Sequence, residues 1–286
     1  MSLRSPTIRS PHAAVVLLAL VALLAGITVS HAGEKEVSCG DTLVGKGSLT
    51  GDCTGNITIQ KGKLELNGFT ITGTGVNAVT CLNRCKLIGP GKIVGGGSDR
   101  GIFGQDRVTL IDVEVSGHTS LGVRSECCGG MKLTRTYVHD NGGTGIQSSK
   151  IKGIDSRINN NGLNGIVSTY RGVRLKRCQI WDNGGSGLVT STDTPEASRA
   201  KLVQTSILGN QEFGILAKHV TMIAVNVTGN SLDPDCGTTM PCTDVASVGE
   251  PKLRGLDNQC DTSLVVPEEL VGPIPFGPSW GVCDLD

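Results

Sequence analysis

Aromatic residues are scarce in this chain, which holds four Phe, two Tyr and two Trp among its 286 residues. We therefore do not expect a compact core built around Phe and Trp, the side chains that bury the largest areas. Glycine is abundant by contrast, with 41 residues. The interior must be filled by aliphatic side chains, and their arrangement has to be read from the order of the residues.

Net charge is also missing, because 26 Lys and Arg balance 26 Asp and Glu. If a leader containing Arg4 and Arg9 is removed, 24 basic residues face 26 acidic ones, and the net charge is −2. A nearly neutral protein has no overall field that would attract a polyanion such as DNA or RNA. We expect no nucleic-acid partner.

Long hydrophobic runs are absent outside the N-terminus. There, AVVLLALVALLAGI follows a basic start and precedes Ser30-His31-Ala32. This order predicts a secretory signal over residues 1–32, and the run is short for a membrane span. We expect a mature chain without a membrane span after signal cleavage. It would be a monomer that is secreted, periplasmic or attached to the cell surface.

A glycine-rich turn recurs along the middle of the chain. Its clearest copies are NGGTGI at 141–146, NGLNGI at 161–166 and NGGSGL at 183–188, and weaker copies follow His118 and Asn210. Apolar residues precede each turn with gaps of two, three and two, as in Val108, Leu110, Val113 and Val115. Gaps of two are typical of strands, and the gap of three predicts a bend between two short strands.

Eight units of about 22 residues predict a parallel β-solenoid in which each unit forms one coil. Equivalent residues should stack along the axis at roughly 4.8 Å, the spacing of paired strands. One predicted inward column is aliphatic: Val115, Val138, Ile158, Ile180, Ile207 and Val227. A second is small and polar: Ser125, Ser148, Ser168, Thr190 and Ala217. We expect its hydroxyls to bond with neighbours in the same column.

On these residues the chain resembles the right-handed parallel β-helix, or pectate-lyase-like, superfamily. The opening CGDT at 39–42 and LELNGFTITG at 64–73 are similar to the first coils of secreted bacterial members, most of which have no assigned activity. The resemblance implies an all-β, single-stranded solenoid with three strands per coil and a right-handed wind. The expected segments are an N-terminal cap with the first coil at 33–63, repeats at 64–231 and a C-terminal cap at 232–286.

All eleven cysteines follow the predicted signal, and this number in an exported chain favours disulfides that pin the two caps. The candidate pairs, whose connectivity the sequence does not settle, are Cys39–Cys53, Cys81–Cys85, Cys236–Cys242 and Cys260–Cys283. Cys178 lies in an inward column between Ser156 and Thr205, and is the candidate free thiol. Cys127 and Cys128 could form a vicinal ring or stay reduced. No His lies near the CxxxC pair, so we expect no metal site.

Candidate catalytic residues surround the recurring turn. His139 and Asp140 precede one copy, and Trp181 and Asp182 occupy the same places two coils later, roughly 9.6 Å away. Two carboxylates at such a distance are at the loose limit for an inverting glycosidase. His139 could act as a base, and Trp181 could support a sugar ring. Alternatively, Asp and Asn stand beside Gly because they tolerate a left-handed backbone, and turn chemistry alone favours this structural interpretation.

Two charged columns are predicted on the outside of the coils. Asp112, Arg135, Asp155 and Arg177 alternate in sign, which is typical of a structural ion-pair ladder. The other column contains only cations: Lys132, Lys152, Arg174 and Lys201. These four residues could bind an acidic polymer such as a uronate chain lying along the axis, with Arg124 and Arg171 at its border. The alternative is a solvated Lys-rich face that discourages aggregation.

Sequence motifs of known β-helix enzymes are missing. The chain has no Asn-Thr-Asp, Asp-Asp, Gly-His-Gly or Arg-Ile-Lys, the four motifs of polygalacturonases. The nearest match to the Asp-Pro-His-Asp of alginate epimerases is DPDC at 233–236, which lacks the histidine. The missing motifs favour a secreted carbohydrate-associated or surface scaffold protein without catalysis, with a polysaccharide or cell-surface glycan as partner and no cofactor. The alternative is a polysaccharide lyase or glycoside hydrolase acting on an acidic polymer, and Ca²⁺ enters only with the lyase.

Overall fold

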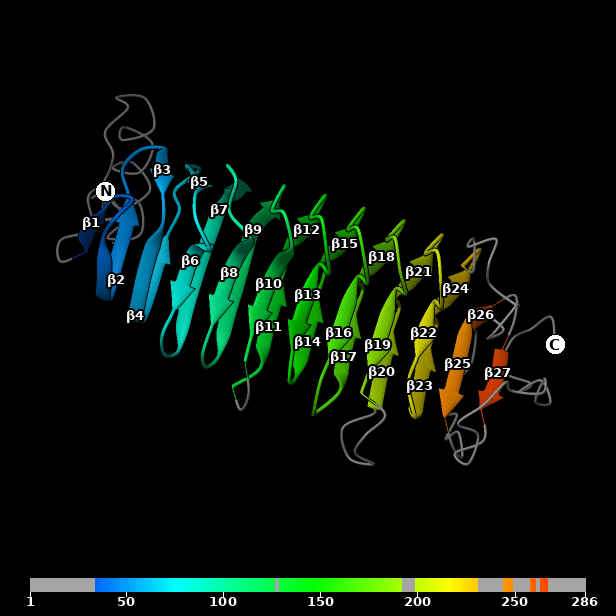
Figure 1. Cartoon of the computed structure of the whole chain (residues 1–286). Helices are drawn as coiled ribbons and strands as arrows, with labels where there is room; N and C mark the ends of the chain where they lie inside the picture. The colour runs from blue at the N-terminus through cyan, green and yellow to red at the C-terminus, as the bar shows by residue number, and fades with distance from the viewer. Residues whose placement is uncertain are drawn as a thin grey trace, which may run out of the picture. The chain divides into compact units, whose positions relative to one another are not determined.

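The computed structural model describes residues 34–126, 129–191, 199–230, 244–248, 258–260 and 263–266. Within these ranges all regular structure is β-strand, and no helix is long and apolar enough to cross a membrane. The strands pair in parallel from coil to coil and form the predicted all-β parallel β-helix, with about eight coils in the repeats (Figure 1). The predicted signal at 1–32 lies outside the described residues.

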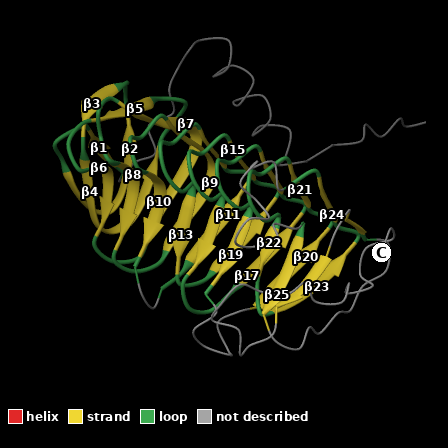
Figure 2. Ribbon diagram, turned by 45° about the vertical axis from the view of Figure 1, so that its right-hand side comes forward, coloured by secondary structure: helices red, strands yellow, loops and turns green. Residues whose placement is uncertain are grey.

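The solenoid has three faces, and each face is a sheet of parallel strands. Figure 2 shows how the strands of successive coils stack. Face A contains β6 (Asn77–Cys81), β8 (Arg100–Gly104), β10 (Leu121–Ser125), β13 (Ile146–Ser148), β16 (Ile166–Ser168), β19 (Leu188–Thr190), β22 (Ile215–Leu216), β25 (Val245–Val248) and β27 (Ser263–Val266). Face B contains β1 (Lys35–Val37), β11 (Met131–Thr134), β14 (Ile151–Ile154), β17 (Val173–Lys176), β20 (Arg199–Val203) and β23 (His219–Ile223).

Face C contains β3 (Cys53–Gly55), β5 (Thr70–Gly73), β12 (Tyr137–His139), β15 (Arg157–Asn159), β18 (Gln179–Trp181), β21 (Ser206–Leu208), β24 (Asn226–Thr228) and β26 (Gln259–Cys260). Four longer strands pass a corner and serve two faces. They are β2 (Thr42–Leu49) and β4 (Ile57–Glu65) on faces A and B, and β7 (Cys85–Gly95) and β9 (Val108–Ser116) on faces B and C.

The predicted aliphatic column exists and fills the interior behind face C. Val138 pairs with Val115 on one side and with Ile158 on the other, and the pairing continues to Val227. Every member of the column is at most 1% exposed. Full burial of one such side chain contributes about 1.5–3 kcal/mol. The stability of the body is therefore spread along the axis.

The predicted Ser and Thr column behind face A is stacked and buried, but its hydrogen bonds differ from the prediction. Ser125 Oγ donates to Asp106 O at 2.9 Å and Ser168 Oγ donates to Ser149 O at 3.4 Å. The Ser125, Ser148 and Ser168 hydroxyls donate to backbone carbonyls of the turns, because an inward hydroxyl at the end of a strand lies beside the unpaired carbonyls there. The Thr190 hydroxyl of the same column has no hydrogen-bond partner among the described residues.

The predicted bend between faces B and C is a single residue with a left-handed backbone in the four coils that contain β9, β11, β14 and β17. Asp112, Arg135, Asp155 and Arg177 occupy it with φ between 48° and 57°. The predicted ladder is resolved into two bidentate pairs, Arg135 with Asp112 at 2.6 and 2.7 Å, and Arg177 with Asp155 at 2.6 and 2.9 Å. The pairing lowers the pKa of both carboxyls through the arginine hydrogen bonds.

The disulfides Cys39–Cys53 and Cys81–Cys85 are formed in the first coils, as predicted. Cys260 is buried and disulfide-bonded, whereas Cys127, Cys128, Cys236, Cys242 and Cys283 lie outside the described residues. Cys178 is buried with a free thiol, and burial raises its pKa. The parallel ladder also includes β25, β26 and β27, which belong to the segment expected as a C-terminal cap.

Candidate functional site

The corner between faces C and A holds a buried ladder of asparagines, which we call the Asn corner. Its members are Asn141, Asn161, Asn183, Asn210 and Asn230. Each Nδ2 donates to Oδ1 of the next residue at 2.8–2.9 Å, and the last donates to Asp244 at 2.7 Å. Each Nδ2 also donates to the carbonyl two residues earlier in its own coil. The recurring asparagine is therefore part of the framework.

The residues that precede the ladder stand at a left-handed corner. Asp140, Asn160 and Asp182 have φ of 51–52°, the conformation that Asp and Asn tolerate best after Gly. Strand register puts Asn160 between the two aspartates, since His139 pairs with Asn159 and Asn159 with Trp181. Backbone geometry accounts for Asp140 and Asp182 at these places.

His139 is engaged in contacts with its neighbours on face C. Its Nδ1 lies 2.7 Å from Asp140 Oδ2, and its Nε2 lies 3.4 Å from Glu114 Oε1 without forming a hydrogen bond. The ring stacks on Tyr137 with centroids 3.9 Å apart. None of the four cavities described below is lined by His139, Asp140 or Asp182. None of these four cavities therefore gathers the three candidates.

The predicted basic column is formed on face B. Lys132 pairs with Lys152, Lys152 with Arg174, and Arg174 with Lys201. All four side chains are exposed. Their like charges stand one coil apart, at roughly 4.8 Å between strands. The column is thus a continuous positive stripe along three successive coil steps.

Turn lengths between faces A and B create a recess beside this stripe. The turn after β13 contains only Ser149 and Lys150, whereas the turns before and after it in the stack span 126–130 and 169–172. A two-residue turn extends less far from the strand ends than a four-residue turn such as 169–172. The recess follows from this difference, and it opens toward both faces.

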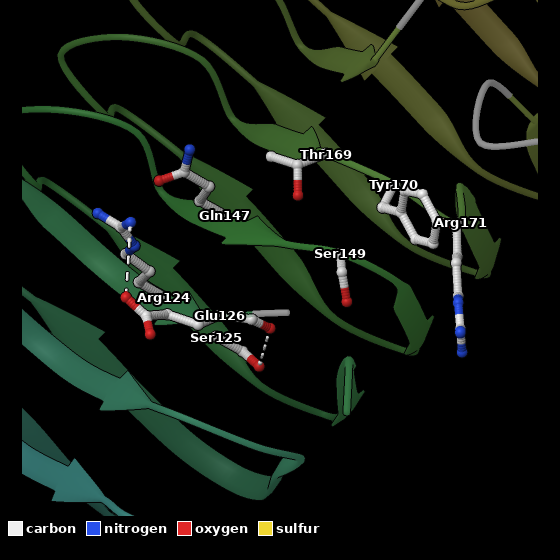
Figure 3. A pocket seen from close by; sticks show the side chains of 8 residues that line it. All are labelled: Arg124, Ser125, Glu126, Gln147, Ser149, Thr169, Tyr170 and Arg171. Carbon is white, nitrogen blue, oxygen red and sulfur yellow. Dashed lines mark hydrogen bonds and ion pairs between the residues drawn. The ribbon is translucent and has the colours of Figure 1, made fainter. Parts of the chain in front are cut away.

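Toward face A the recess is a cavity of about 670 Å³, which we call the Ser149 cleft. It is lined by Arg124, Ser125, Glu126, Gln147, Ser149, Thr169, Tyr170 and Arg171. Figure 3 shows Ser149 between Glu126 and Tyr170, with Gln147 on β13 and Thr169 directly after β16. Tyr170 is 53% exposed, and the Arg171 guanidinium lies 5.6 Å from its ring centroid. Hydroxyl, amide, aromatic and cationic groups therefore meet in one cleft, together with the Glu126 carboxylate, which lies 3.8 Å from Arg124.

Toward face B the recess is a smaller cavity of about 170 Å³, the basic pocket. It is lined by Arg107, Gly129, Gly130, Met131, Lys132, Lys150, Lys152 and Arg171. Arg171 lines both cavities, so the pocket and the cleft adjoin. Five cations and no carboxylate line the pocket, so it is suited to an anionic group.

Two polar groups in the recess are in unfavourable surroundings: a hydroxyl without a hydrogen-bond partner and an amine among other cations. Ser149 is 3% exposed, and its Oγ has no hydrogen-bond partner in the structure. Burial, and then the positive charges of Lys152 and Arg174, lower the pKa of the Lys150 amine. An unpaired buried hydroxyl and crowded cations both destabilise the unliganded protein. A ligand with acceptor oxygens and negative charge would relieve both.

The recess was only partly predicted. Lys132 and Lys152 were candidates, with Arg124 and Arg171 as a border, but Ser149, Lys150, Tyr170 and Gln147 were not. Unequal spacing between the repeats is the signal that identifies the short turn. Lys201 and Arg174 continue the stripe outside the lining of the pocket. Trp181 lies on face C, on a different side of the coil.

A metal site is not assembled in the described part of the chain. No group of three or more His, Cys, Asp or Glu there could hold an ion. Calcium takes six to eight oxygen ligands, and the described ranges offer no cluster of carboxylates for the Ca²⁺ that the lyase alternative would use.

Comparisons with known proteins agree with this architecture. A family model described as right handed beta helix region matches residues 101–241. The chain is similar to tailspike protein 2 of Escherichia coli O157:H7 bacteriophage CAB120, with a TM-score of 0.53 and 14% identity over 77% of this chain. This chain spans 38% of the length of that tailspike.

Two further solved structures are less similar. Pectate lyase Pel9A has a TM-score of 0.42 and 10% identity over 82% of this chain and 68% of its own. The A-module of Azotobacter vinelandii mannuronan C-5 epimerase AlgE4 has a TM-score of 0.36 and 17% identity over 90% and 93%. No curated protein sequence matches the chain. At these identities the likenesses concern the fold alone.

Proposed function

We propose that this chain, which belongs to the right-handed parallel β-helix superfamily, is a carbohydrate-associated protein that binds an anionic polysaccharide in the basic pocket and the Ser149 cleft. The observation that carries the proposal is the stack of cations, one per coil, beside a cleft with an unpaired buried hydroxyl. Its disulfides are typical of proteins of oxidising compartments. We infer that the chain acts outside the cytoplasm as a monomer.

The chemistry of the recess favours a charged sugar polymer. A linear polyuronate carries one carboxylate per residue, and the stripe offers one cation per coil along the same direction. Gln147, Ser149 and Thr169 can bond to sugar hydroxyls, and the exposed ring of Tyr170 can cover the C–H face of a pyranose. Cations alone would accept any polyanion, so these neutral groups supply the selectivity for a saccharide.

A second candidate function, β-elimination on the same polymer, is favoured by Lys150. An amine with a lowered pKa holds a larger neutral fraction at a given pH and is a better proton acceptor. Its Nζ would take the proton from the carbon next to the uronate carboxylate. The glycosidic C–O bond on the adjacent carbon would break, leaving a C=C bond in one product and a hydroxyl on the other after protonation by water.

Calorimetric titration with polygalacturonate and alginate oligomers tests the binding function. We expect Lys152→Ala to weaken binding at least tenfold, because it removes a cation of the basic pocket. Lys176→Ala is the matched control, since Lys176 is exposed on the outer face of the same sheet but lines no described cavity. Affinity should fall with rising salt. Equal affinities of the two variants would contradict the proposal.

The same oligomers separate binding from elimination. Incubation with the protein followed by measurement of unsaturated-uronate absorbance reports a lyase, and new reducing ends without absorbance report hydrolysis. Loss of absorbance in Lys150→Met would assign the base. Binding without either product leaves the non-catalytic function.

A further inference from the structure

Face C carries a second hollowed surface, on a different side of the coil from the basic stripe. A cavity of about 260 Å³ is lined by Gln179, Ile180, Trp181, Ser206 and Leu208. A cavity of about 340 Å³ is lined by Asp155, Ser156, Arg157, Arg177, Cys178, Gln179, Gln204 and Ser206. Gln179 and Ser206 line both, so the two cavities form one surface depression, which we call the Trp181 trough.

The outer side chains of face C differ between its two halves. In the earlier coils they contact one another: Lys92 lies 3.1 Å from Glu114, Glu114 lies 3.4 Å from His139, and His139 stacks on Tyr137. In the later coils the side chains of Arg157, Gln179 and Ser206 make no hydrogen bond or ion pair with any described residue. These three side chains are therefore unpaired within the described ranges.

Buried polar atoms at the border of the trough lack partners as well. Asn159 precedes Trp181 in the same outward column, is 3% exposed, and its Oδ1 accepts no hydrogen bond. Asn226 pairs with Ser206 and stands one coil after it in the column that also contains Gln179. Its Oδ1 is likewise buried without a partner. Unpaired buried acceptors are rare in folded proteins, and a water or a ligand hydroxyl can supply the missing donor.

We propose that the Trp181 trough binds a neutral oligosaccharide. The indole provides an apolar plane beside Leu208, on which the C–H face of a pyranose can stack. The amides of Gln179 and Gln204 and the hydroxyl of Ser206 can bond to ring hydroxyls, which are the donors and acceptors that a neutral sugar offers.

Charge distinguishes this ligand from the polyanion of the basic pocket. Arg177 is neutralised by the bidentate contact with Asp155, which leaves Arg157 as the one unpaired charge among the lining residues. The basic pocket has five cations and no carboxylate. The two surfaces therefore differ in the ligand they select, and the trough does not depend on the anionic site.

Tryptophan fluorescence provides a direct test, because the chain has two Trp residues. In a Trp280→Phe background, Trp181 is the sole emitter. Titration with cellohexaose, xylohexaose and mannohexaose should quench or shift its emission saturably with at least one of them. Gln179→Ala should weaken that response at least fivefold. No saturable change with any of the three up to about 10 mM, well above a millimolar Kd, would overturn the proposal.

Calorimetry of two variants separates the two sites. Trp181→Ala should abolish binding of the neutral oligosaccharide and keep binding of polygalacturonate. Lys152→Ala should weaken polygalacturonate binding at least tenfold and keep binding of the neutral oligosaccharide. Loss of neutral binding in Lys152→Ala but not in Trp181→Ala would overturn the trough. If Trp181→Ala fails to fold, as judged by circular dichroism, Gln179→Ala with Ser206→Ala replaces it, since both side chains are surface groups without partners.

Discussion

The two corners at the ends of the face A strands are built from similar polar residues but differ in how well those residues are paired. At the Asn corner, Asn161 is 1% exposed, and its amide donates at 2.9 Å and accepts at 2.9 Å. At the recess on the other side, Ser149 is 3% exposed with an unpaired hydroxyl, and Lys150 stands among cations. The amides of the Asn corner are paired with one another, whereas the hydroxyl and the amine of the recess have no partner of this kind.

This difference separates framework from site without reference to sequence motifs. A ladder that satisfies every amide stabilises the coil stack and has nothing left to offer a ligand. Open groups at the recess lower the stability of the free protein, as functional groups often do. Mutations at the two corners should therefore act on different measurements, and three predictions test this.

Breaking the ladder should have the largest effect. Asn161→Gly removes the amide between Asn141 and Asn183 and leaves buried groups unpaired, so we expect a loss of about 2–4 kcal/mol in unfolding free energy. Asn160→Gly is the matched control, because Asn160 is exposed with φ of 51°, which Gly also adopts. It should change stability by less than about 0.5 kcal/mol. Urea unfolding followed by circular dichroism measures both, and equal losses would contradict the contrast.

Acid should weaken the N-terminal end of the same corner, where His118 replaces an asparagine. His118 is 1% exposed, its Nε2–H donates to Ile93 O at 3.2 Å, and its Nδ1 accepts from Ser98 at 2.8 Å. Burial lowers its pKa below the ordinary 6.5, so the unfolded chain binds the proton more readily. The contribution of His118 is complete above about pH 6.5 and is lost as the pH falls below it.

Urea unfolding at several pH values measures this dependence. The slope for one proton is at most about 1.4 kcal/mol per pH unit. His118→Asn should flatten the curve between neutral and mildly acidic pH, because the amide cannot titrate and can donate to Asn141. The same slope in both proteins would show that His118 does not contribute.

Removing a positive charge from the recess should have the smallest effect on stability, and it should raise the unfolding free energy rather than lower it. The lowered pKa of Lys150 means that the folded state disfavours its charged form, so Lys150→Met should raise the unfolding free energy slightly, by less than about 1 kcal/mol. It should also weaken polygalacturonate binding. Lys176→Met, outside the cluster, should leave both unchanged. A clear loss of stability in Lys150→Met would place this lysine in the framework.

Much of the fold could be predicted because the turn and the apolar positions within each repeat define how that repeat aligns with its neighbours. The glycine turns and the gaps of two, three and two located the inward column from Val115 to Val227 and the bend at Asp112. The predicted stripe from Lys132 to Lys201 is stacked for the same reason. The partners of the Ser125 hydroxyl could not be predicted, because they depend on where turn carbonyls lie in three dimensions.

Periodicity in the sequence determined the coil, its inward columns and the position of each charge along the axis, because stacking converts a repeat in sequence into a neighbour in space. The tertiary structure alone decided which charged or polar residues face an open space. His139 and Asp140 contact each other at a corner that lines none of the four cavities described above, and Ser149 and Lys150 lie in a recess lined by residues of the neighbouring turns. Such a recess arises between coils, so no single repeat contains it.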